Sequence, residues 1–367
     1  MTSADPIAFY ACKAEYADLE AQILPLTARV LATGQMLQGP EVTAFEARVA
    51  AMAGTQHAVA VGSGTDALFF ALLTQNIGAG DEVLVPAISF LASATAILRT
   101  GATPVFVDID SNCALDLAHA ATLVTPQTRA LVIVDLFGAM ADPAPVEAFA
   151  AAHNLAIIED FAQAFGASYN DRRSGSIGTA SATSFDPTKV IGAPGSGGAL
   201  VTNDARVATR VRGLRLHGKQ GSSFVEMGYN SQLPSWTAAI LALKLDHHAA
   251  WTARRRAVAQ IYQTAFADLP LTLPQHAVAA DHVWHKFVLF CEARDALAAH
   301  LAAASIPTMI HYATPLYAEP LFANPQNPAH FPGANRHART ALSLPIHSYL
   351  SDAQAHSVAA TVRQFFA

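Results

Sequence analysis

Short apolar runs rich in β-branched residues recur along the first half of the chain and alternate with helix-like segments. The runs cover residues 57–61, 82–86, 103–108, 130–137 and 156–160, and the segments between them cover 65–76, 89–99, 116–123 and 143–153. Regular alternation of strand and helix predicts a mostly parallel sheet that helices cover on both faces. The expected fold class is therefore α/β.

This alternation fails after residue 160. Two further strand-like runs, 182–185 and 198–203, are separated only by a loop, so we expect at least one of them to be antiparallel and the central sheet to have seven strands. Helices are expected at 14–34 and 41–53 before the sheet, and at 205–216 and 234–266 after it. A strand at 285–290 and helices at 294–304 and 352–366 predict a small C-terminal α+β domain. We divide the chain into a large domain, 1–250, and a small one, 251–367.

Composition adds a prediction about assembly. Hydrophobic residues make up 52% of the chain and charged residues 14%, against about 25% charged in an average soluble domain. So little charge predicts that some of the surface is buried between subunits. The formal net charge is −6 and no basic tract occurs, which argues against nucleic acid as a partner. The arginine triple Arg254–Arg256 is expected on a solvated helix face, with a phosphate-binding patch as the alternative.

The cysteines and the apolar runs indicate where the protein resides. Three cysteines stand far apart, which argues against a disulfide framework and a cysteine metal site. The first residues lack the pattern of a secretory leader, and no apolar run approaches the roughly 18 residues of a membrane span. We therefore expect a cytoplasmic protein with no membrane partner. The histidine pairs 247/248 and 282/285 lack a third ligand nearby, so no metal is expected.

Chemically useful side chains gather around residues 156–198. Asp160 ends a buried run, and Lys189 follows another run just before four glycines. The loop GSGTDAL, residues 62–68, lies between a strand and a helix, where free N–H groups favour a phosphate. Taken singly, these features also fit a helix N-cap, a surface lysine and a plain tight turn. In this order they meet the needs of pyridoxal phosphate: a lysine, an acid for the pyridine nitrogen and donors for the phosphate.

The chain resembles the DegT-type family of sugar aminotransferases, which are pyridoxal-phosphate enzymes of fold type I. The resemblance runs over nearly the whole length, and its motifs are specific in their order and spacing. The matching stretches are QGPEVTAFE (38–46), AVAVGSGTDAL (58–68), GDEVLVPAISFLASATAI (80–97), GATPVFVDID (101–110), IIEDFAQAFGA (157–167), SFDPTKVIGAPGSGGALVTND (184–204), RLHG (215–218), YN (229–230), HYATPLY (311–317) and LSLPIH (342–347).

This resemblance implies a role for each matching residue. Lys189 would form a Schiff base with the cofactor, and Asp160 would contact its pyridine nitrogen. The other implied cofactor contacts are Gln163 at the phenolic oxygen, Phe90 on the ring face, Gly64, Thr65 and Ser184 at the phosphate, and Asn230 at the phosphate of a partner subunit. That last contact implies a homodimer with shared sites.

The resemblance also implies the reaction. An amino group would pass from L-glutamate, through pyridoxamine phosphate, to a 3- or 4-keto-6-deoxy sugar carried on a nucleotide diphosphate. His217, Gln232, His311 and Tyr312 are the candidate substrate contacts, although His217 and His311 also suit packing roles. A lysine at position 189 favours transamination, because relatives that dehydrate sugars carry histidine there.

Three positions depart from the family pattern. Gln232 replaces an arginine that can touch substrate, Asp135 replaces a histidine and Thr183 replaces a phenylalanine. We expect Asp135 and Thr183 to alter the pocket wall more than the cofactor chemistry. The alternatives are amination of a keto-cyclitol, a non-catalytic regulator that kept the fold, and a nucleotide-dependent dehydrogenase. The dehydrogenase lacks support, since no acid ends the strand after GSGTDAL.

Overall fold

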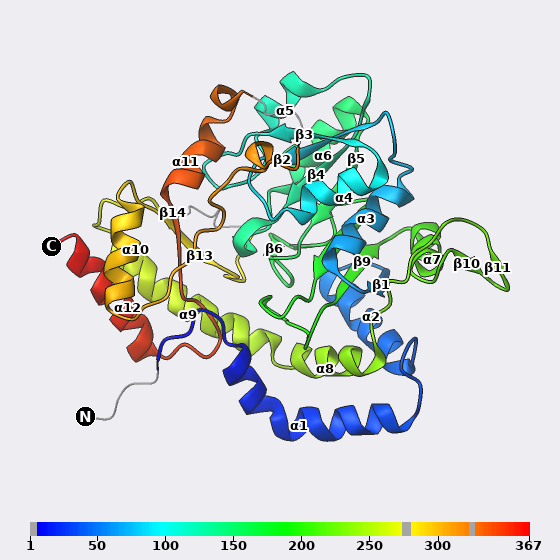
Figure 1. Ribbon diagram of the computed structural model, residues 1–367, viewed down its shortest axis with the longest axis horizontal. Coiled ribbons are helices and arrows are strands. Elements are labelled where there is room, and N and C mark those ends of the chain that lie inside the picture. The colour runs from blue at the N-terminus through cyan, green and yellow to red at the C-terminus, as the bar shows by residue number, and fades with distance from the viewer. Residues whose placement is uncertain (1–5, 274–279, 323–326) are drawn as a thin grey trace.

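A seven-stranded mixed sheet forms the centre of the computed structural model, which describes residues 6–273, 280–322 and 327–367 (Figure 1). The strand order is β1-β9-β8-β5-β4-β2-β3. Their bounds are β1 His57–Val61, β2 Glu82–Pro86, β3 Thr103–Val107, β4 Thr128–Val134, β5 Ala156–Asp160, β8 Ala180–Ser184 and β9 Gly198–Thr202. Strand β9 is antiparallel to both β8 and β1, and the other neighbouring pairs are parallel. The predicted fold class and the antiparallel strand are confirmed.

Helices cover both faces of the sheet because its strands are apolar on both sides. On β4, Val132 packs into one core while its neighbours Leu131 and Ile133 pack into another, as the alternation of a strand requires. The first core is closed by α3 Gly64–Thr74, α4 Ala92–Thr100 and α7 Ala205–Leu214. The second core is closed by α2 Pro40–Ala53, α5 Leu117–Leu123, α6 Pro143–His153 and α8 Ser235–Leu245, with α1 Cys12–Ala32 packed on α8.

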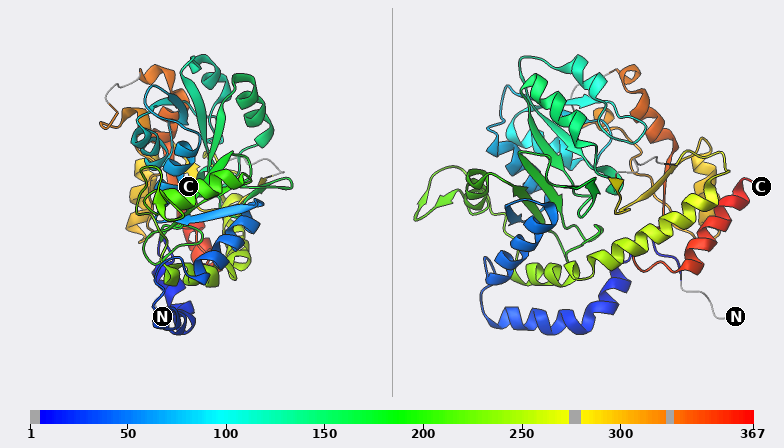
Figure 2. Two further views of the ribbon diagram at one scale, coloured as in Figure 1. Left: turned by 90° about the vertical axis from the view of Figure 1, so that its right-hand side faces the viewer. Right: turned by 180° about the vertical axis from the view of Figure 1, so that it is seen from behind.

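A third core fills the small lobe at the C-terminal end (Figure 2). Tyr262 and Phe287 are fully buried there. The lobe comprises α9 His248–Phe266, β13 Phe287–Phe290, α10 Arg294–Ala303, α11 Pro332–Thr340, β14 Ala341–Leu344 and α12 Asp352–Phe365. Short elements elsewhere are β6 Ser168–Tyr169, β7 Arg172–Arg173, β10 Lys219–Gln220, β11 Ser223–Phe224, β12 Ala280–Asp281 and three 3₁₀ turns, Leu136–Gly138, Leu316–Ala318 and Pro328–His330. The domain boundary at residue 250 stays a prediction, since α9 runs across it.

Two expected elements are wrong in extent. The single helix expected over 234–266 breaks into α8 and α9, because Arg48 donates to the carbonyl of Ala242 (2.6 Å) and to the carboxylate of Asp246 (2.7 Å) at the break. The strand expected over 130–137 ends at Val134, and a 3₁₀ turn follows it. No proline or glycine marks the break between α8 and α9 in the sequence, whereas Gly138 ends the turn after β4.

The arginine triple lies in the middle of α9, and only Arg256 of the three is exposed. Arg255 is buried and donates to the carbonyls of Trp284 (3.2 Å) and Ile346 (2.9 Å). Arg254 donates to the carbonyl of Leu350. These contacts fasten α9 to other parts of the small lobe, so a solvated face and a phosphate patch are both wrong for Arg254 and Arg255, whereas Arg256 is exposed and pairs with Asp281. Within the described ranges, no helix is long and apolar enough to cross a membrane.

Candidate active site

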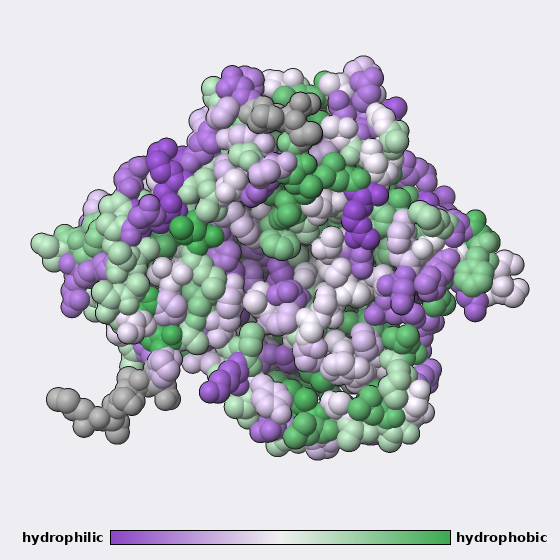
Figure 3. All heavy atoms as spheres, viewed as in Figure 1, coloured by the Kyte–Doolittle hydropathy of each residue, from purple (hydrophilic) through white to green (hydrophobic). Residues whose placement is uncertain are grey.

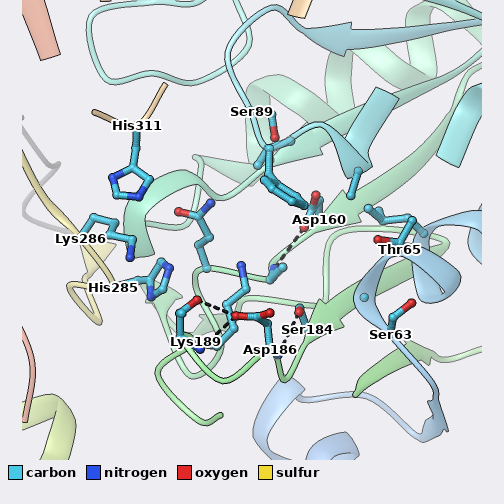
Figure 4. Close-up of a pocket in the computed structure, with 18 of the residues that line it drawn as sticks. Ser63, Thr65, Ser89, Asp160, Ser184, Asp186, Lys189, His285, Lys286 and His311 are labelled. Atoms are coloured by element: carbon cyan, nitrogen blue, oxygen red, sulfur yellow. Dashed lines mark hydrogen bonds between the residues drawn. The ribbon is translucent and has the colours of Figure 1, made fainter. Parts of the chain in front are cut away.

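The candidate site is a cavity of about 310 Å³ at the carboxyl ends of β5 and β8 (Figure 4). In an open α/β sheet this edge is where ligands bind. Segments far apart in the sequence meet there, including the start of α3, the loop after β8 and two stretches of the small lobe. The cavity is lined by nine of the predicted site residues, namely Gly64, Thr65, Phe90, Asp160, Gln163, Ser184, Lys189, His311 and Tyr312.

The first turn of α3 is built to receive an anion. Ser63 caps the helix by accepting a hydrogen bond from the N–H of Asp66 (3.1 Å), while the N–H groups of Gly64 and Thr65 have no intrahelical partner. Gly64 is required by close approach, because a Cβ there would lie 2.6 Å from the Cβ of Ser184. The sequence GSG therefore places bare backbone donors beside a serine hydroxyl.

Asp160 ends β5 and is not a helix N-cap, because only turns follow it. One carboxylate oxygen accepts from the N–H of Ala162 (3.2 Å), as in a local turn. The other accepts from the hydroxyl of Ser93 (2.8 Å), which in turn contacts the hydroxyl of Ser89 (2.8 Å). Burial raises the pKa of Asp160, and Ser93 and Lys189 oppose that shift. The carboxylate is thus held rigidly, with an oxygen atom at the cavity.

Lys189 lies half-buried on the turn that follows β8. Its N–H donates to the carbonyl of Asp186 (2.9 Å), whose carboxylate accepts from the N–H (2.9 Å) and the hydroxyl (2.6 Å) of Thr188. Burial lowers the pKa of Lys189, and the carboxylates of Asp160 and Asp186 oppose the shift. A surface lysine is excluded by this placement. An amine with a lowered pKa is available as a nucleophile and as a base.

Gln163 joins the sheet to the small lobe across the cavity. Its side-chain oxygen accepts from the N–H of Phe137 (3.0 Å), and its nitrogen donates to the hydroxyl of Tyr312 (3.1 Å).

Phe90 lies outside the helix predicted for it, because that helix begins only at Ala92. Its side chain is 58% exposed, and its ring centre lies 6.5 Å from that of Tyr312. The ring of Phe90 is therefore exposed at the mouth of the cavity.

The far end of the cavity carries three basic side chains. His311 contacts the hydroxyl of Ser343 through Nδ1 (2.8 Å), and its pKa is lowered to about 3 by burial and by Lys286 and Lys189. His285 and Lys286 also line the cavity, and sequence reasoning missed both. The sequence did offer a sign of them, since two basic residues open the apolar run HKFVLF. The strand begins only at Phe287, so these two residues precede it.

The sequence model of the DegT/DnrJ/EryC1/StrS aminotransferase family matches residues 17–363. The chain belongs to this family. It is 43% identical, over 97% of its own length and 99% of the relative's, to the erythromycin biosynthesis sensory transduction protein EryC1 of Saccharopolyspora erythraea. It is also 43% identical to a dTDP-3-amino-3,4,6-trideoxy-alpha-D-glucose transaminase of Streptomyces venezuelae, with 98% of this chain and 96% of the relative covered.

The fold agrees with that of solved family members. The crystal structure of S. venezuelae DesV in complex with a ketimine intermediate superposes with a TM-score of 0.96 at 42% identity and covers 99% of both chains. Relatives of this family are nucleotide-sugar transaminases by name, and one of the most similar is named as a sensory protein.

Three predicted site residues of this DegT family member lie away from the cavity. Asn230 and His217 are exposed, and Gln232 accepts a hydrogen bond from the side chain of Gln38 (2.6 Å). None of the three is among the cavity-lining residues of the described chain. Their roles in binding therefore stay predictions that require a second copy of the chain.

The other two departures from the family pattern also lie outside the cavity, so the expectation that they alter its wall is wrong. Thr183 is fully buried within β8. Asp135 is buried beside Glu159, and burial together with the Glu159 charge raises its pKa well above the usual range. Among the described residues, no group of three histidine, cysteine or acidic side chains could hold a metal ion.

Proposed function

We propose that the protein is a pyridoxal-phosphate-dependent aminotransferase that moves an amino group from L-glutamate to the keto sugar of a nucleotide-diphosphate sugar. The observation that carries the proposal is the placement of half-buried Lys189 and buried Asp160 in one cavity with the anion-binding start of α3. The alternative dehydrogenase has no comparable support, since its dinucleotide would need neither the lysine nor this acid. Membership of an aminotransferase family points the same way.

The residues of the cavity fit pyridoxal phosphate. This cofactor, when bound, supplies an electrophilic carbon and an electron sink, with pyridoxamine phosphate as its aminated form. Gly64, Thr65 and Ser184 would donate hydrogen bonds to the phosphate, and Asp160 would hold a proton on the pyridine nitrogen. Phe90 would lie against the ring, and Gln163 would approach the phenolic oxygen.

Lys189 has two tasks in this proposal. Its amine would attach the cofactor covalently and, when free, would take a proton from the donor carbon and return one to the sugar carbon. Burial lowers the pKa of Lys189, which favours the uncharged amine that this role requires. Tyr312 and His311, placed across the cavity, would orient the sugar. His311 is uncharged there and acts as a hydrogen-bond partner.

The complete site requires a homodimer. Phe224 (68%), Val225 (54%) and Met227 (80%) are exposed apolar side chains on and just after the β10–β11 hairpin. Apolar atoms, coloured green, are visible near the right-hand edge of Figure 3, on the side where Figure 1 labels this hairpin. Such side chains at the tip of a protruding arm are typical of a contact surface. We place Asn230 near the partner's phosphate site, with His217 and Gln232 at the partner's substrate. Sedimentation of wild type and Phe224→Ser tests the dimer, since the variant should weaken it.

Assays with keto sugars test the reaction. Purified protein with added cofactor should acquire the absorbance of bound pyridoxal phosphate and should aminate at least one nucleotide keto sugar with glutamate. A nucleoside diphosphate should raise the melting temperature, which a keto-cyclitol enzyme would not show. If Lys189→Ala left the biological activity intact, the protein would be a regulator instead. The cysteines are free thiols, in keeping with our proposal that the enzyme works in the cytoplasm.

A further inference from the structure

Lys286 is the second lysine of the cavity and has no part in the chemistry described above. It directly precedes β13 and is only 5% exposed. Its Nζ donates to the hydroxyl of Tyr10 (3.1 Å) and lies over the rings of Tyr10 (4.2 Å) and Phe9 (5.4 Å). In Figure 4 it lies with His285 and His311 at the end of the cavity opposite Ser63 and Thr65, with Lys189 and Asp160 between the two ends.

The described chain offers Lys286 no counter-ion. None of the ion pairs among the described residues includes it, although a buried ammonium group without a partner anion is costly. The pKa of Lys286 is lowered to about 6, mainly by burial and then by Lys189 and Arg255, against the opposing effects of Asp186 and Cys12. An anion that entered this end of the cavity would restore the charged form.

The cavity has few groups that can bind a carboxylate. No arginine lines it within the described chain, and its only lysines are Lys189 and Lys286. His285 and His311 are kept uncharged, because burial lowers the pKa of each. Lys189 must remain free to move protons in an aminotransferase. An amino-acid donor nevertheless brings at least one carboxylate into the cavity, and desolvating that group requires a cation or several donors.

We propose that Lys286 is the donor-binding residue of this enzyme and pairs with a carboxylate of the incoming amino acid. The inference rests on the proposed aminotransferase function. It assigns Lys286 to the donor half of the reaction, while the sugar, which has no carboxylate of its own, uses His311, Tyr312 and the partner subunit. Binding of the donor is coupled to uptake of a proton from solvent, because Lys286 binds the carboxylate in its ammonium form.

Measuring the donor and sugar half-reactions separately distinguishes a donor-binding role of Lys286 from a role in binding the nucleotide diphosphate. In Lys286→Met, the apparent dissociation constant for glutamate should rise about tenfold to a hundredfold, the effect of losing a hydrogen bond between charged groups. The sugar half-reaction, started from the aminated cofactor, should change less than about threefold. Lys286→Arg should recover part of the donor affinity. A loss confined to the sugar half-reaction would overturn the proposal and assign Lys286 to the nucleotide diphosphate.

Calorimetry supplies a readout that does not depend on turnover. Glutarate, a dicarboxylate with no amine, is titrated into cofactor-loaded protein at about pH 7.5 in two buffers of different ionisation enthalpy. Wild type should take up close to one proton per site, since an amine with a pKa of about 6 is largely uncharged at that pH. Lys286→Met should lose this uptake, and Lys13→Met, which removes an exposed lysine of α1, should keep it. Absorbance of the bound cofactor corrects for its own titration.

These outcomes keep the two proposals apart. Equal proton uptake in wild type and Lys286→Met would overturn the role of Lys286 and leave the aminotransferase function standing. Uptake that depends on Lys286, in a protein that aminates no keto sugar, would support the carboxylate site and contradict the sugar substrate. Circular dichroism and cofactor absorbance identify a variant that has failed to fold, and Lys286→Gln then replaces Lys286→Met.

Discussion

Replacement of Ser93 by alanine tests how the candidate site holds its acid. The Ser93 hydroxyl is fully buried and donates to Asp160 at 2.8 Å, which stabilises the charged carboxylate. Removing it leaves a buried carboxylate oxygen without that partner. A hydrogen bond to a charged group contributes about 1.5 to 3 kcal/mol, so cofactor affinity should fall roughly tenfold to a hundredfold. Ser93 is a positioning residue here, since it would act on the cofactor only through Asp160.

Titration of apo-protein with pyridoxal phosphate, followed by absorbance, measures this loss directly. The pKa of Asp160 should rise in Ser93→Ala, because the bond with Ser93 opposes the effect of burial. Ser89→Ala is the matched control: Ser89 contacts Ser93 (2.8 Å) and has no hydrogen bond to Asp160, so its effect should stay within about threefold. Equal cofactor affinity in wild type and Ser93→Ala would refute the reasoning and show that the N–H of Ala162 suffices.

Three further predictions concern the lysine, the glycine cradle and a buried acid pair. Lys189→Ala should lower the rate of amine transfer at least about a hundredfold while the cofactor still binds, as shown by turnover and absorbance together. Gly64→Ala places a Cβ 2.6 Å from the Cβ of Ser184 and should weaken cofactor binding by about 1 to 3 kcal/mol, measured by the same titration. Asp135 has a raised pKa beside Glu159, so its contribution to folding stability is present at low pH and is lost as pH rises through the folded-state pKa. Urea unfolding followed upward from the ordinary carboxyl pKa of about 4 should therefore show a smaller fall in stability for Asp135→Asn than for wild type.

The sequence was most informative where one physical pattern dominates. Strands buried on both faces read as continuous apolar runs, so the seven strands of the sheet could be located with ends within a few residues. Asp160 and Lys189 could be found because each ends or follows such a run, at the edge where ligands bind. The split between α8 and α9 could not be found, since it depends on Arg48, a residue about 200 positions away in the chain.

Lys286 and Arg255 were missed for a shared reason. Lysine and arginine are usually solvated, and nothing in the local sequence shows that the small lobe buries both. Arg255 satisfies backbone carbonyls there, whereas Lys286 faces the cavity. Asn230, which we assign to the site of a partner subunit, differs from these two residues. Within one chain it does not line the cavity, so its role cannot be judged from this chain alone.

The antiparallel strand β9 has a consequence for protein engineering. Gly198, its first residue, runs against the backbone of Ser63, so closely that a Cβ would lie 2.4 Å from the Ser63 carbonyl carbon. Ser196 donates to the carbonyl of Gly62 (2.9 Å) just before it. The connection from β8 to β9, residues 185–197, therefore carries Lys189 at one end and is fastened to the anion cradle at the other. Its length is fixed from both sides, so libraries that alter substrate choice should leave it intact and vary the small lobe instead.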